Sequence, residues 1–181
     1  TQLFAVKAGL TVPTPRLEGD RLFLTSFYNG SMMLQLAQDK PAARVLWRAR
    51  ENVTERKTEG LHSIMSTPVL KDGHIYGVCS YGQLRCLKID SGERVWEDLT
   101  ATNLRGKQKE ERWGLAFLIP HEDRFFLFNE HGELILANLS PDGYRELGRV
   151  KVVEPTNPLV NRPVVWMHPA FANKCIYARN D

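Results

Sequence analysis

The sequence has few cysteines and no long apolar run, and these two absences exclude several classes of protein. Its 181 residues include three cysteines, none of which stands in a C-x-x-C pair. A disulfide-rich secreted scaffold is therefore excluded, and we expect buried free thiols at Cys79, Cys86 and Cys175. No apolar run approaches the roughly 18 residues that suggest a membrane-spanning helix, so we expect no transmembrane segment.

An excess of charge of one sign is also lacking. The net charge is +3, and acidic and basic residues are interleaved in the runs Glu55–Lys57 and Lys107–Arg112. Proteins that bind nucleic acid usually concentrate basic residues on one face, so we expect no nucleic-acid partner. Mixed runs of this kind are typical of solvated loops.

Motifs for metal or phosphate chemistry are missing as well. The histidines lack the i, i+4 and Cys-x-x-Cys spacings of metal sites, and they are His62, His74, His121, His131 and His168. Gly106–Lys107 lacks the spacing of a phosphate-binding loop. We therefore expect no metal ligands and no catalytic residues. His74 and His131 are predicted to be solvated at turn edges, and His168 to make a structural hydrogen bond in an inner strand.

What the sequence does contain is a succession of short strand-like runs, clearest from Ser66 to Trp96. Three turns separate four runs in this stretch, and they are Lys71–Gly73, Ser80–Gln83 and Asp90–Glu93. The run Leu84–Ile89 alternates apolar and polar residues, which is typical of a half-buried strand. Four short antiparallel strands joined by tight turns predict one blade of a β-propeller.

The same pattern recurs at intervals of about 50 residues. An offset of 50 (132 minus 82) places Gly82 on Gly132, and an offset of 53 (68 minus 15) places Pro68 on Pro15. An offset of 101 (169 minus 68) places Pro68 on Pro169. A repeat of this length indicates a propeller or a solenoid. We predict an all-β fold in which this chain holds about three full four-stranded antiparallel blades and parts of two more.

The repeat also sets the domain boundaries. We assign residues 1–10 to the end of a preceding blade, residues 11–50, 62–97 and 113–153 to three blades, and residues 164–181 to the start of the last blade. A closed propeller has roughly 4 to 8 blades, so we expect the chain to be part of a larger ring. A partial ring exposes strand edges and apolar blade faces, and either the rest of the ring or another copy is expected to cover them.

Several repeated residues predict structure rather than chemistry. Gly82 and Gly132 permit a positive φ in a hairpin turn, and Gly92 does the same in the turn before the outermost strand. Trp47 and Trp96 each carry a large apolar face, which we expect to pack between neighbouring blades.

The stretch from Ser66 to Trp96 also carries the pattern of a known repeat. Its segments resemble the pyrroloquinoline-quinone (PQQ)-like repeat, and they are Thr67–Val69, Asp72–Tyr76, Gly82–Leu84 and Asp90–Trp96. Tyr81 departs from the pattern, because aspartate is usual at its position. The resemblance implies an eight-bladed ring in the full protein.

A second resemblance concerns the end of the chain. Val165–Asn173, followed by Arg179–Asp181, is similar to the C-terminal part of exported outer-membrane-assembly-like PQQ-repeat proteins of planctomycete-type bacteria. This resemblance implies a periplasmic or cell-envelope location. It also implies a non-catalytic scaffold that binds a protein partner.

Two other functions remain open. A PQQ-dependent quinoprotein dehydrogenase would use PQQ and calcium, and the resemblance would then require a vicinal cysteine pair, a tryptophan floor and carboxylate or amide ligands to the metal. The sequence has no adjacent cysteines and no acidic cluster at an inner strand, so we expect no cofactor. The other alternative is a sensor domain joined to a kinase-like protein.

Candidate binding residues follow from the connectors between blades. The connectors 51–61, 98–112 and 154–163 are long, emerge on one face of the ring and lead into inner strands. Binding residues concentrate on such loops, and arginine and aromatic side chains are frequent anchors. We predict a binding site at this mouth of the channel, formed by His62, Met65, Arg112, Trp113, Trp166 and His168. The alternative is that Trp113 and Trp166 simply pack between blades.

Overall fold

The computed structural model describes residues 4, 7–49, 54–159 and 161–180. The first sheet contains β1 (Arg16–Glu18), β2 (Arg21–Ser26), β3 (Gly30–Leu36) and β4 (Ala43–Arg48). The second contains β5 (Val69–Lys71), β6 (His74–Val78), β7 (Leu84–Lys88) and β8 (Arg94–Asp98). The third contains β9 (Ala116–His121), β10 (Arg124–Asn129), β11 (Glu133–Ser140) and β12 (Gly143–Lys151).

Two hairpins complete the described structure. They are β13 (Asn157–Leu159) with β14 (Arg162–Val164), and β15 (Ala170–Ala172) with β16 (Cys175–Tyr177). None of the described residues forms a helix, so these ranges contain no apolar helix that could cross a membrane. Of residues 1–10, which we assigned to the end of a preceding blade, residues 1–3 and 5–6 lie outside the described residues.

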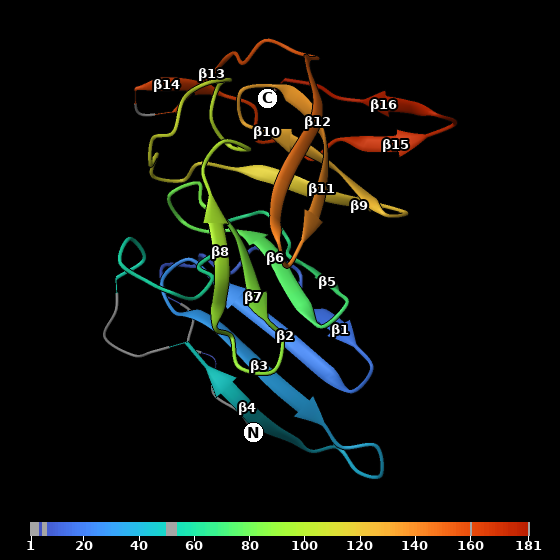
Figure 1. Cartoon of the computed structure of the whole chain (residues 1–181). Coiled ribbons are helices and arrows are strands. Elements are labelled where there is room, and N and C mark those ends of the chain that lie inside the picture. Colours follow the sequence, from blue (N-terminus) through green and yellow to red (C-terminus); the bar gives the residue numbers. More distant parts are fainter. Residues whose placement is uncertain (1–3, 5–6, 50–53, 160, 181) are drawn as a thin grey trace.

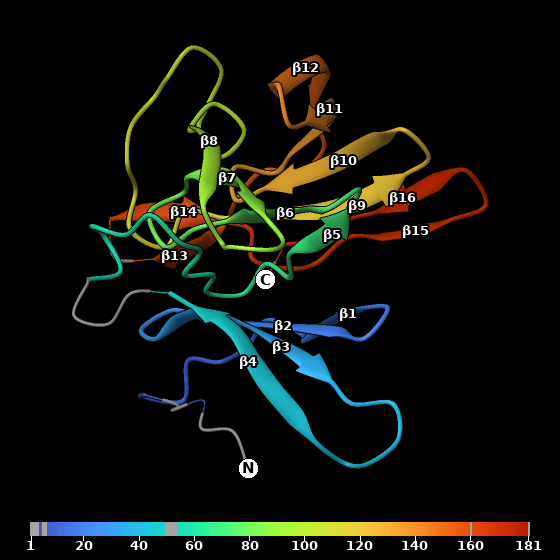
Figure 2. The ribbon, with the colours of Figure 1, turned by 60° about the horizontal axis from the view of Figure 1, so that its bottom comes forward.

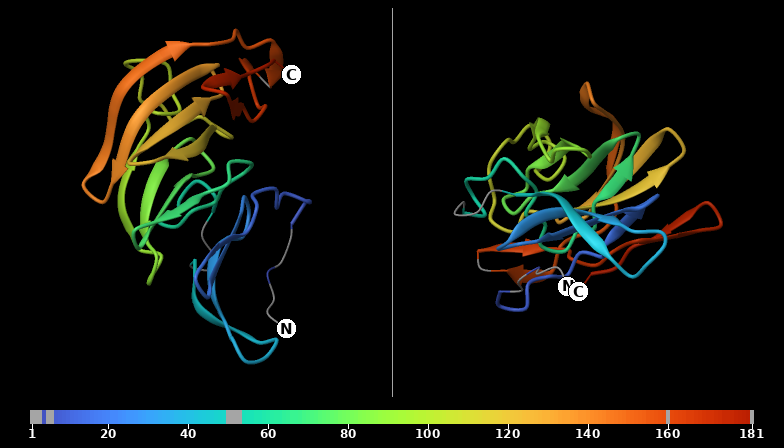
Figure 3. Two further views of the ribbon diagram at one scale, coloured as in Figure 1. Left: turned by 90° about the vertical axis from the view of Figure 1, so that its right-hand side faces the viewer. Right: turned by 90° about the horizontal axis from the view of Figure 1, so that it is seen from below.

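The sheets follow one another along an arc in chain order (Figure 3). Within each four-stranded sheet the strands are antiparallel and lie in sequence order, from β1 to β4, β5 to β8 and β9 to β12. The first strand of each sheet lies on the inner side, where β1 contacts β5. This is the arrangement of propeller blades. The predicted all-β propeller with three full blades is confirmed, and eight blades in the full ring stays a prediction.

The apolar side chains are buried between the blades rather than in one common core. Phe23 and Met33 of the first blade pack with Ile75 and Leu87 of the second. In the same way the second blade packs on the third, and the third packs on the chain around β15 and β16. Contact between successive blades, which removes apolar surface from water, therefore stabilises the arc.

A tryptophan on the outermost strand fastens each of the first two blades to the next. Trp47 Nε1–H donates a hydrogen bond of 2.8 Å to the carbonyl of Ile89, and Trp96 Nε1–H donates one of 2.8 Å to the carbonyl of Ser140. Ile89 directly follows β7 and Ser140 is the last residue of β11, so both acceptors lie where the third strand of the next blade ends. The prediction that both tryptophans pack between neighbouring blades is confirmed.

A β-bulge at a fixed place accompanies each outermost strand. The register shifts directly after Met33 in the first blade, after Cys86 in the second and after Leu136 in the third. These positions are separated by 53 (86 minus 33) and 50 (136 minus 86) residues, the offsets of the sequence repeat. A bulge bends a strand and changes the direction of its side chains. Because the bulges recur at the offsets of the sequence repeat, the bulge is part of the repeated structure of the blade.

The third blade departs from this design at the tryptophan position. Met33 pairs with Trp47 and Cys86 with Trp96, whereas Leu136 pairs with Gly148. A side chain added at Gly148 would meet open space.

The cysteines only partly follow the expectation of buried thiols. Cys79 and Cys86 are buried, and burial raises the pKa of the Cys86 thiol to about 11. Cys175 is exposed, so the prediction is wrong at that position. The reason is that β16 forms the edge of a sheet that has two strands among the described residues.

Replacing Gly92 with alanine tests the docking of Trp47. Both Gly92 (φ +70°) and Gly106 (φ +81°) have left-handed backbones, so alanine strains either position by about 1–2 kcal/mol. An added methyl group at Gly92 would lie 2.7 Å from the Trp47 ring, whereas at Gly106 it would meet no atom within 4 Å. We expect Gly92→Ala to lower the free energy of unfolding by a further 1–3 kcal/mol or so, measured by urea titration. Equal losses in Gly92→Ala and Gly106→Ala would contradict the docking.

Candidate functional site

The three long connectors between blades meet at one end of the arc. They comprise residues 49–68, 99–115 and 152–169. The third was expected to be an irregular connector from 154 to 163, but it contains the β13–β14 hairpin. This hairpin lies beside the second connector, drawn in yellow-green, in Figures 1 and 2. The connectors therefore form a continuous surface rather than separate loops.

Two reciprocal ion pairs join the first connector to the second. Arg56 lies 3.2 Å from the Glu110 carboxylate, and Arg112 lies 3.3 Å from the Glu55 carboxylate. Each connector thus supplies one arginine and one glutamate. The mixed charge runs were expected to be solvated loops. That expectation is wrong for Glu55, whose side chain is only 20% exposed, because the opposite connector covers it.

Both arginines also stack on aromatic rings. The Arg56 guanidinium lies 5.5 Å from the centre of the Tyr81 ring, and that of Arg112 lies 4.8 Å from the Trp113 ring. The side chains of Arg56 and Arg112 remain 62% and 45% exposed. We call Arg56, Tyr81, Arg112 and Trp113 the mouth surface. Exposed ion pairs and cation–π contacts each contribute about 1 kcal/mol or less, so they orient these side chains more than they stabilise the fold.

The backbone at Trp113 is strained. Its φ of 66° lies in the left-handed region, which a bulky residue rarely adopts. Such a conformation costs about 1–3 kcal/mol and is concentrated at functional sites. It is held by hydrogen bonds of 2.8 Å from Trp113 N–H to the carbonyl of Ser80 and from Gly114 N–H to that of Glu111. The strain places the Trp113 ring beside Arg112.

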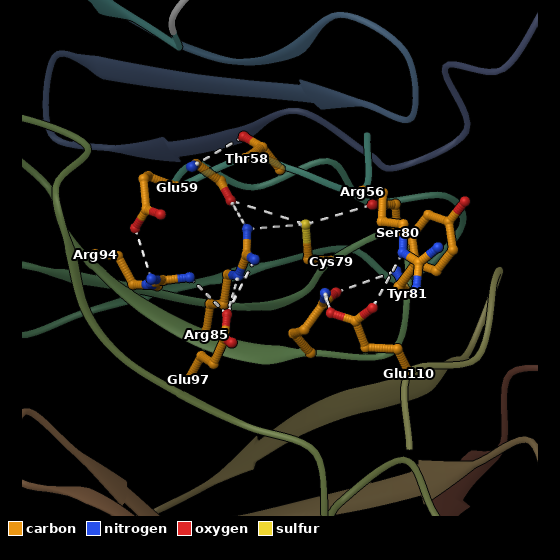
Figure 4. A network of polar contacts seen from close by, with 12 residues as sticks. Arg56, Thr58, Glu59, Cys79, Ser80, Tyr81, Arg85, Arg94, Glu97 and Glu110 are labelled. Carbon is orange, nitrogen blue, oxygen red and sulfur yellow. Dashed lines mark hydrogen bonds and ion pairs between the residues drawn. The ribbon is translucent and has the colours of Figure 1, made fainter. Parts of the chain in front are cut away.

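A buried arginine anchors the first connector on the second blade (Figure 4). The Arg85 side chain is 2% exposed and lies 3.0 Å from the Glu97 carboxylate. Its guanidinium donates to the carbonyl of Gly60 on the connector and lies 3.2 Å from the Cys79 sulfur. Arg94 holds the connector a second time, 2.6 Å from Glu59. These contacts fix the segment that carries Glu55 and Arg56.

A buried carboxylate joins the third connector to the mouth surface. Glu130 is fully buried, and its oxygens accept hydrogen bonds from Arg162 Nε at 2.9 Å and from Trp166 Nε1 at 3.2 Å. Arg162 also donates a hydrogen bond of 3.0 Å to the carbonyl oxygen of Arg112. A buried charge needs such partners, because burying it alone is costly. Trp166 and Arg112 are therefore connected through Glu130 and Arg162.

The predicted mouth residues fall into four environments. Arg112 and Trp113 lie on the mouth surface itself. Trp166 and Met65 lie beneath it, packed against one apolar cluster between the third blade and the chain that follows. Trp166 thus packs between the third blade and the chain that follows, as in the alternative given for it above, and it also contacts Glu130. His62 is buried, and His168 lies in a separate cavity. Whether these residues bind a partner stays a prediction.

His62 is held neutral beneath the mouth surface. Its Nδ1 lies 2.9 Å from the carbonyl oxygen of Phe27, and a carbonyl only accepts, so Nδ1 carries the hydrogen. Its Nε2 is buried and has no hydrogen-bond partner among the described residues. Burial lowers the pKa of His62. Burial also lowers the pKa of His131, which is half-buried, so its predicted solvated position is wrong.

A cavity of about 430 Å³ lies between the inner strands. Blades one to three and the chain before β15 all contribute, with Arg16, Thr67, Val69, Phe117, Ile119 and His168 among the lining residues. Thr67, Phe117 and His168 occupy the same place in successive repeats, at offsets of 50 (117 minus 67) and 101 (168 minus 67). We call this space the inner-strand cavity. It is the described part of the central channel.

The lining of this cavity does not fit PQQ and calcium. Arg16 is the one lysine, arginine, aspartate or glutamate in the lining, whereas PQQ carries several carboxylates. No lining residue supplies a carboxylate for calcium, which binds oxygen ligands. Within the described ranges no group of three histidine, cysteine, aspartate or glutamate residues is placed to hold a metal ion.

Sequence reasoning missed several residues of these two sites. Glu55 and Glu110 lie in runs that resemble solvated loops, so nothing local indicated their pairing. Arg16 gave no signal beyond its place in an inner strand. Tyr81 did give one, because it stands where the repeat usually has aspartate, and the structure places Arg56 over its ring.

Comparison with known proteins identifies the fold. No protein-family model and no curated protein matches the chain. Among solved structures it is similar to BamB from Moraxella catarrhalis, with a TM-score of 0.58 and 15% identity over 93% of this chain and 41% of that chain. It is also similar to quinohemoprotein alcohol dehydrogenase from Comamonas testosteroni, with a TM-score of 0.51 and 15% identity over 83% and 22%.

The chain thus spans less than half the length of either protein. Both are propellers of the PQQ-repeat type, so the fold implied by the repeat is confirmed. The planctomycete-like membership stays a prediction.

Replacing His62 with asparagine tests its buried neutral state. In the unfolded chain histidine gains a proton as the pH falls through about 6.5, whereas the lowered pKa of His62 keeps it neutral in the folded protein. The folded state therefore loses stability below that pH, by up to about 1.4 kcal/mol per pH unit for each such histidine. Asparagine retains an N–H donor for the Phe27 carbonyl but does not titrate.

We expect His62→Asn to reduce the slope of unfolding free energy against pH between about pH 7 and pH 5, measured by urea titrations across that range. A residual slope remains, because burial lowers the pKa of His131 in both proteins. A slope equal to that of the wild type would show that His62 takes up a proton in the folded state.

Proposed function

We propose that this chain is part of a non-catalytic propeller that binds a protein partner at the mouth surface. The observation that carries the proposal is the joining of the three connectors into one surface, on which Arg56 and Arg112 are stacked, paired and still partly exposed. Arginine, tryptophan and tyrosine are the residues most often found to dominate the energy of protein interfaces. Because ion pairs and ring contacts already fix the side chains of Arg56 and Arg112, little side-chain entropy is lost when a partner binds.

The charge of the surface favours a protein over a nucleic acid. Each exposed arginine is accompanied by a glutamate, so the surface presents no concentrated positive charge. Nucleic-acid affinity depends on such charge, because binding neutralises phosphates. A mixed surface with aromatic centres and charged rims is instead typical of protein interfaces.

We also propose a location in the bacterial cell envelope, which suits a scaffold that binds a protein partner. We base this part of the proposal on the resemblance of Val165–Asn173 and Arg179–Asp181 to the C-terminal part of exported PQQ-repeat proteins. We further propose that the rest of a ring, or another copy, covers β15 and β16, where Phe171 and Tyr177 are 38% and 57% exposed. Exposed aromatic side chains on a sheet edge favour such a partner.

A PQQ-dependent dehydrogenase is the alternative function. The likeness of fold to a quinohemoprotein alcohol dehydrogenase favours it. The lining of the inner-strand cavity, with Arg16 and His168 as its ionisable residues and no carboxylate, opposes it. We therefore propose the binding function and no cofactor for these blades.

Substitution of the two exposed arginines tests the proposal. The immobilised chain is used to capture proteins from a bacterial cell-envelope extract, and retained proteins are quantified by mass spectrometry. We expect the double variant Arg56→Ala, Arg112→Ala to retain its main partner at least about tenfold less than the wild type, as for the loss of interface hot spots.

The matched control is Arg124→Ala. Arg124 is also half-exposed, and its loose ion pair of 3.7 Å with Asp123 lies at the turn between β9 and β10, away from the connectors. It should retain the partner as the wild type does. Equal retention of the partner by the wild type and both variants, with equal melting temperatures, would contradict the proposal that the partner binds at the mouth surface.

A further inference from the structure

Arg16 lines the inner-strand cavity, and none of the described acidic residues pairs with its side chain. Arg16 is partly buried, and its side chain makes no ion pair and no hydrogen bond with another described residue. The other lining residues include no aspartate and no glutamate. Two arginines whose side chains are more deeply buried, Arg85 and Arg149, have carboxylate partners. Arg16 therefore differs from them in facing a cavity with an unused planar donor group.

A second donor faces the same cavity. Thr67 Oγ1 accepts a hydrogen bond of 3.1 Å from the backbone N–H of Thr14. That bond uses an oxygen lone pair, so the hydroxyl hydrogen of Thr67 stays available, and it has no acceptor among the described residues. A guanidinium and a hydroxyl that both donate match a group that only accepts, and an ionised carboxylate is such a group.

Apart from Thr14 and His168, the rest of the lining is apolar. The rings of Phe117 and His168 lie 4.8 Å apart at 58°, and Val69 and Ile119 extend the apolar wall. His168 Nδ1 lies 2.7 Å from the Pro169 carbonyl, which fixes the ring beside Phe117. A cavity of about 430 Å³ with a mostly apolar wall and few polar groups has the size and composition of a small-molecule site.

We propose that the inner-strand cavity binds a small monocarboxylic acid with an aromatic or branched apolar body. Arg16 and Thr67 hold the carboxylate, and Phe117, His168 and the aliphatic wall contact the body. One guanidinium matches one carboxylate, which distinguishes this ligand from the multiply charged PQQ. The site lies on the inner strands and uses none of the residues of the mouth surface, so it does not rest on the proposed partner binding.

Phenylacetate is a suitable probe, and phenylacetamide is its neutral counterpart of the same shape. Binding of each to the whole chain is measured by ligand-observed NMR titration. We expect phenylacetate to bind at least about tenfold more tightly than phenylacetamide, because a hydrogen bond to a charged group contributes more than one between neutral groups.

Two variants locate the site. Arg16→Gln removes the charge and breaks no ion pair or side-chain hydrogen bond with the described residues, so it should fold normally and lose the preference for phenylacetate. Arg21→Gln removes an arginine of the same blade whose partner is Asp90, at 2.6 Å, and it should keep the preference.

Equal binding of acid and amide by the wild type, or an unchanged preference in folded Arg16→Gln, would overturn the proposal. The double variant Arg56→Ala, Arg112→Ala should bind phenylacetate as the wild type does. Failure at the mouth surface and failure in the cavity can therefore be distinguished.

Discussion

The hydrogen bond from an outer-strand indole to the next blade is the interaction on which the rest of the structure depends. A single blade buries its apolar side chains only against a neighbour, so the relative position of two blades decides whether Phe23 and Tyr76 are covered. Trp47 and Trp96 fix that position at the outer rim, far from the inner strands. Each combines a large apolar face with one directed N–H donor. The inner strands and their cavity are placed as a consequence.

The connectors show how the same scaffold creates a surface. Because blade positions are fixed, the loops that leave one blade and enter the next meet at one end. Arg85 and Glu130 are buried charges that fasten these loops from below, and the exposed pairs Arg56–Glu110 and Arg112–Glu55 join them above. Buried charges with several partners are costly to disrupt, whereas exposed pairs are weak. The loops that carry the mouth surface are therefore firmly held, whereas its arginine side chains can still bind a partner.

The sequence predicted the fold well because the fold is repeated. Glycine turns, Pro15 and Pro68, and the two docking tryptophans recur at intervals of about 50 residues, and local turn chemistry is visible in a single sequence. The candidate sites were predicted less well. Pairing of Arg56 with Glu110 joins residues 54 positions apart in separate connectors, and no local pattern encodes it. The β13–β14 hairpin, and the lack of a partner for the Arg16 side chain among the described residues, likewise depend on which segments the arc brings together. Trp166 was found because aromatic residues are conspicuous, but its contact with Glu130 was not foreseen.

Hydrogen exchange of the indole N–H groups tests most directly the claim that tryptophan docking holds the blades together. The four tryptophans are few enough for each indole signal to be followed by ¹⁵N NMR after transfer to D₂O. Slow opening of a cooperative unit protects all of its hydrogen bonds to a similar degree. The Nε1–H groups of Trp47 and Trp96 should therefore exchange as slowly as the backbone amides of β3 and β7. Rapid indole exchange while those amides stay protected would show that the blades separate without unfolding, and would contradict the account.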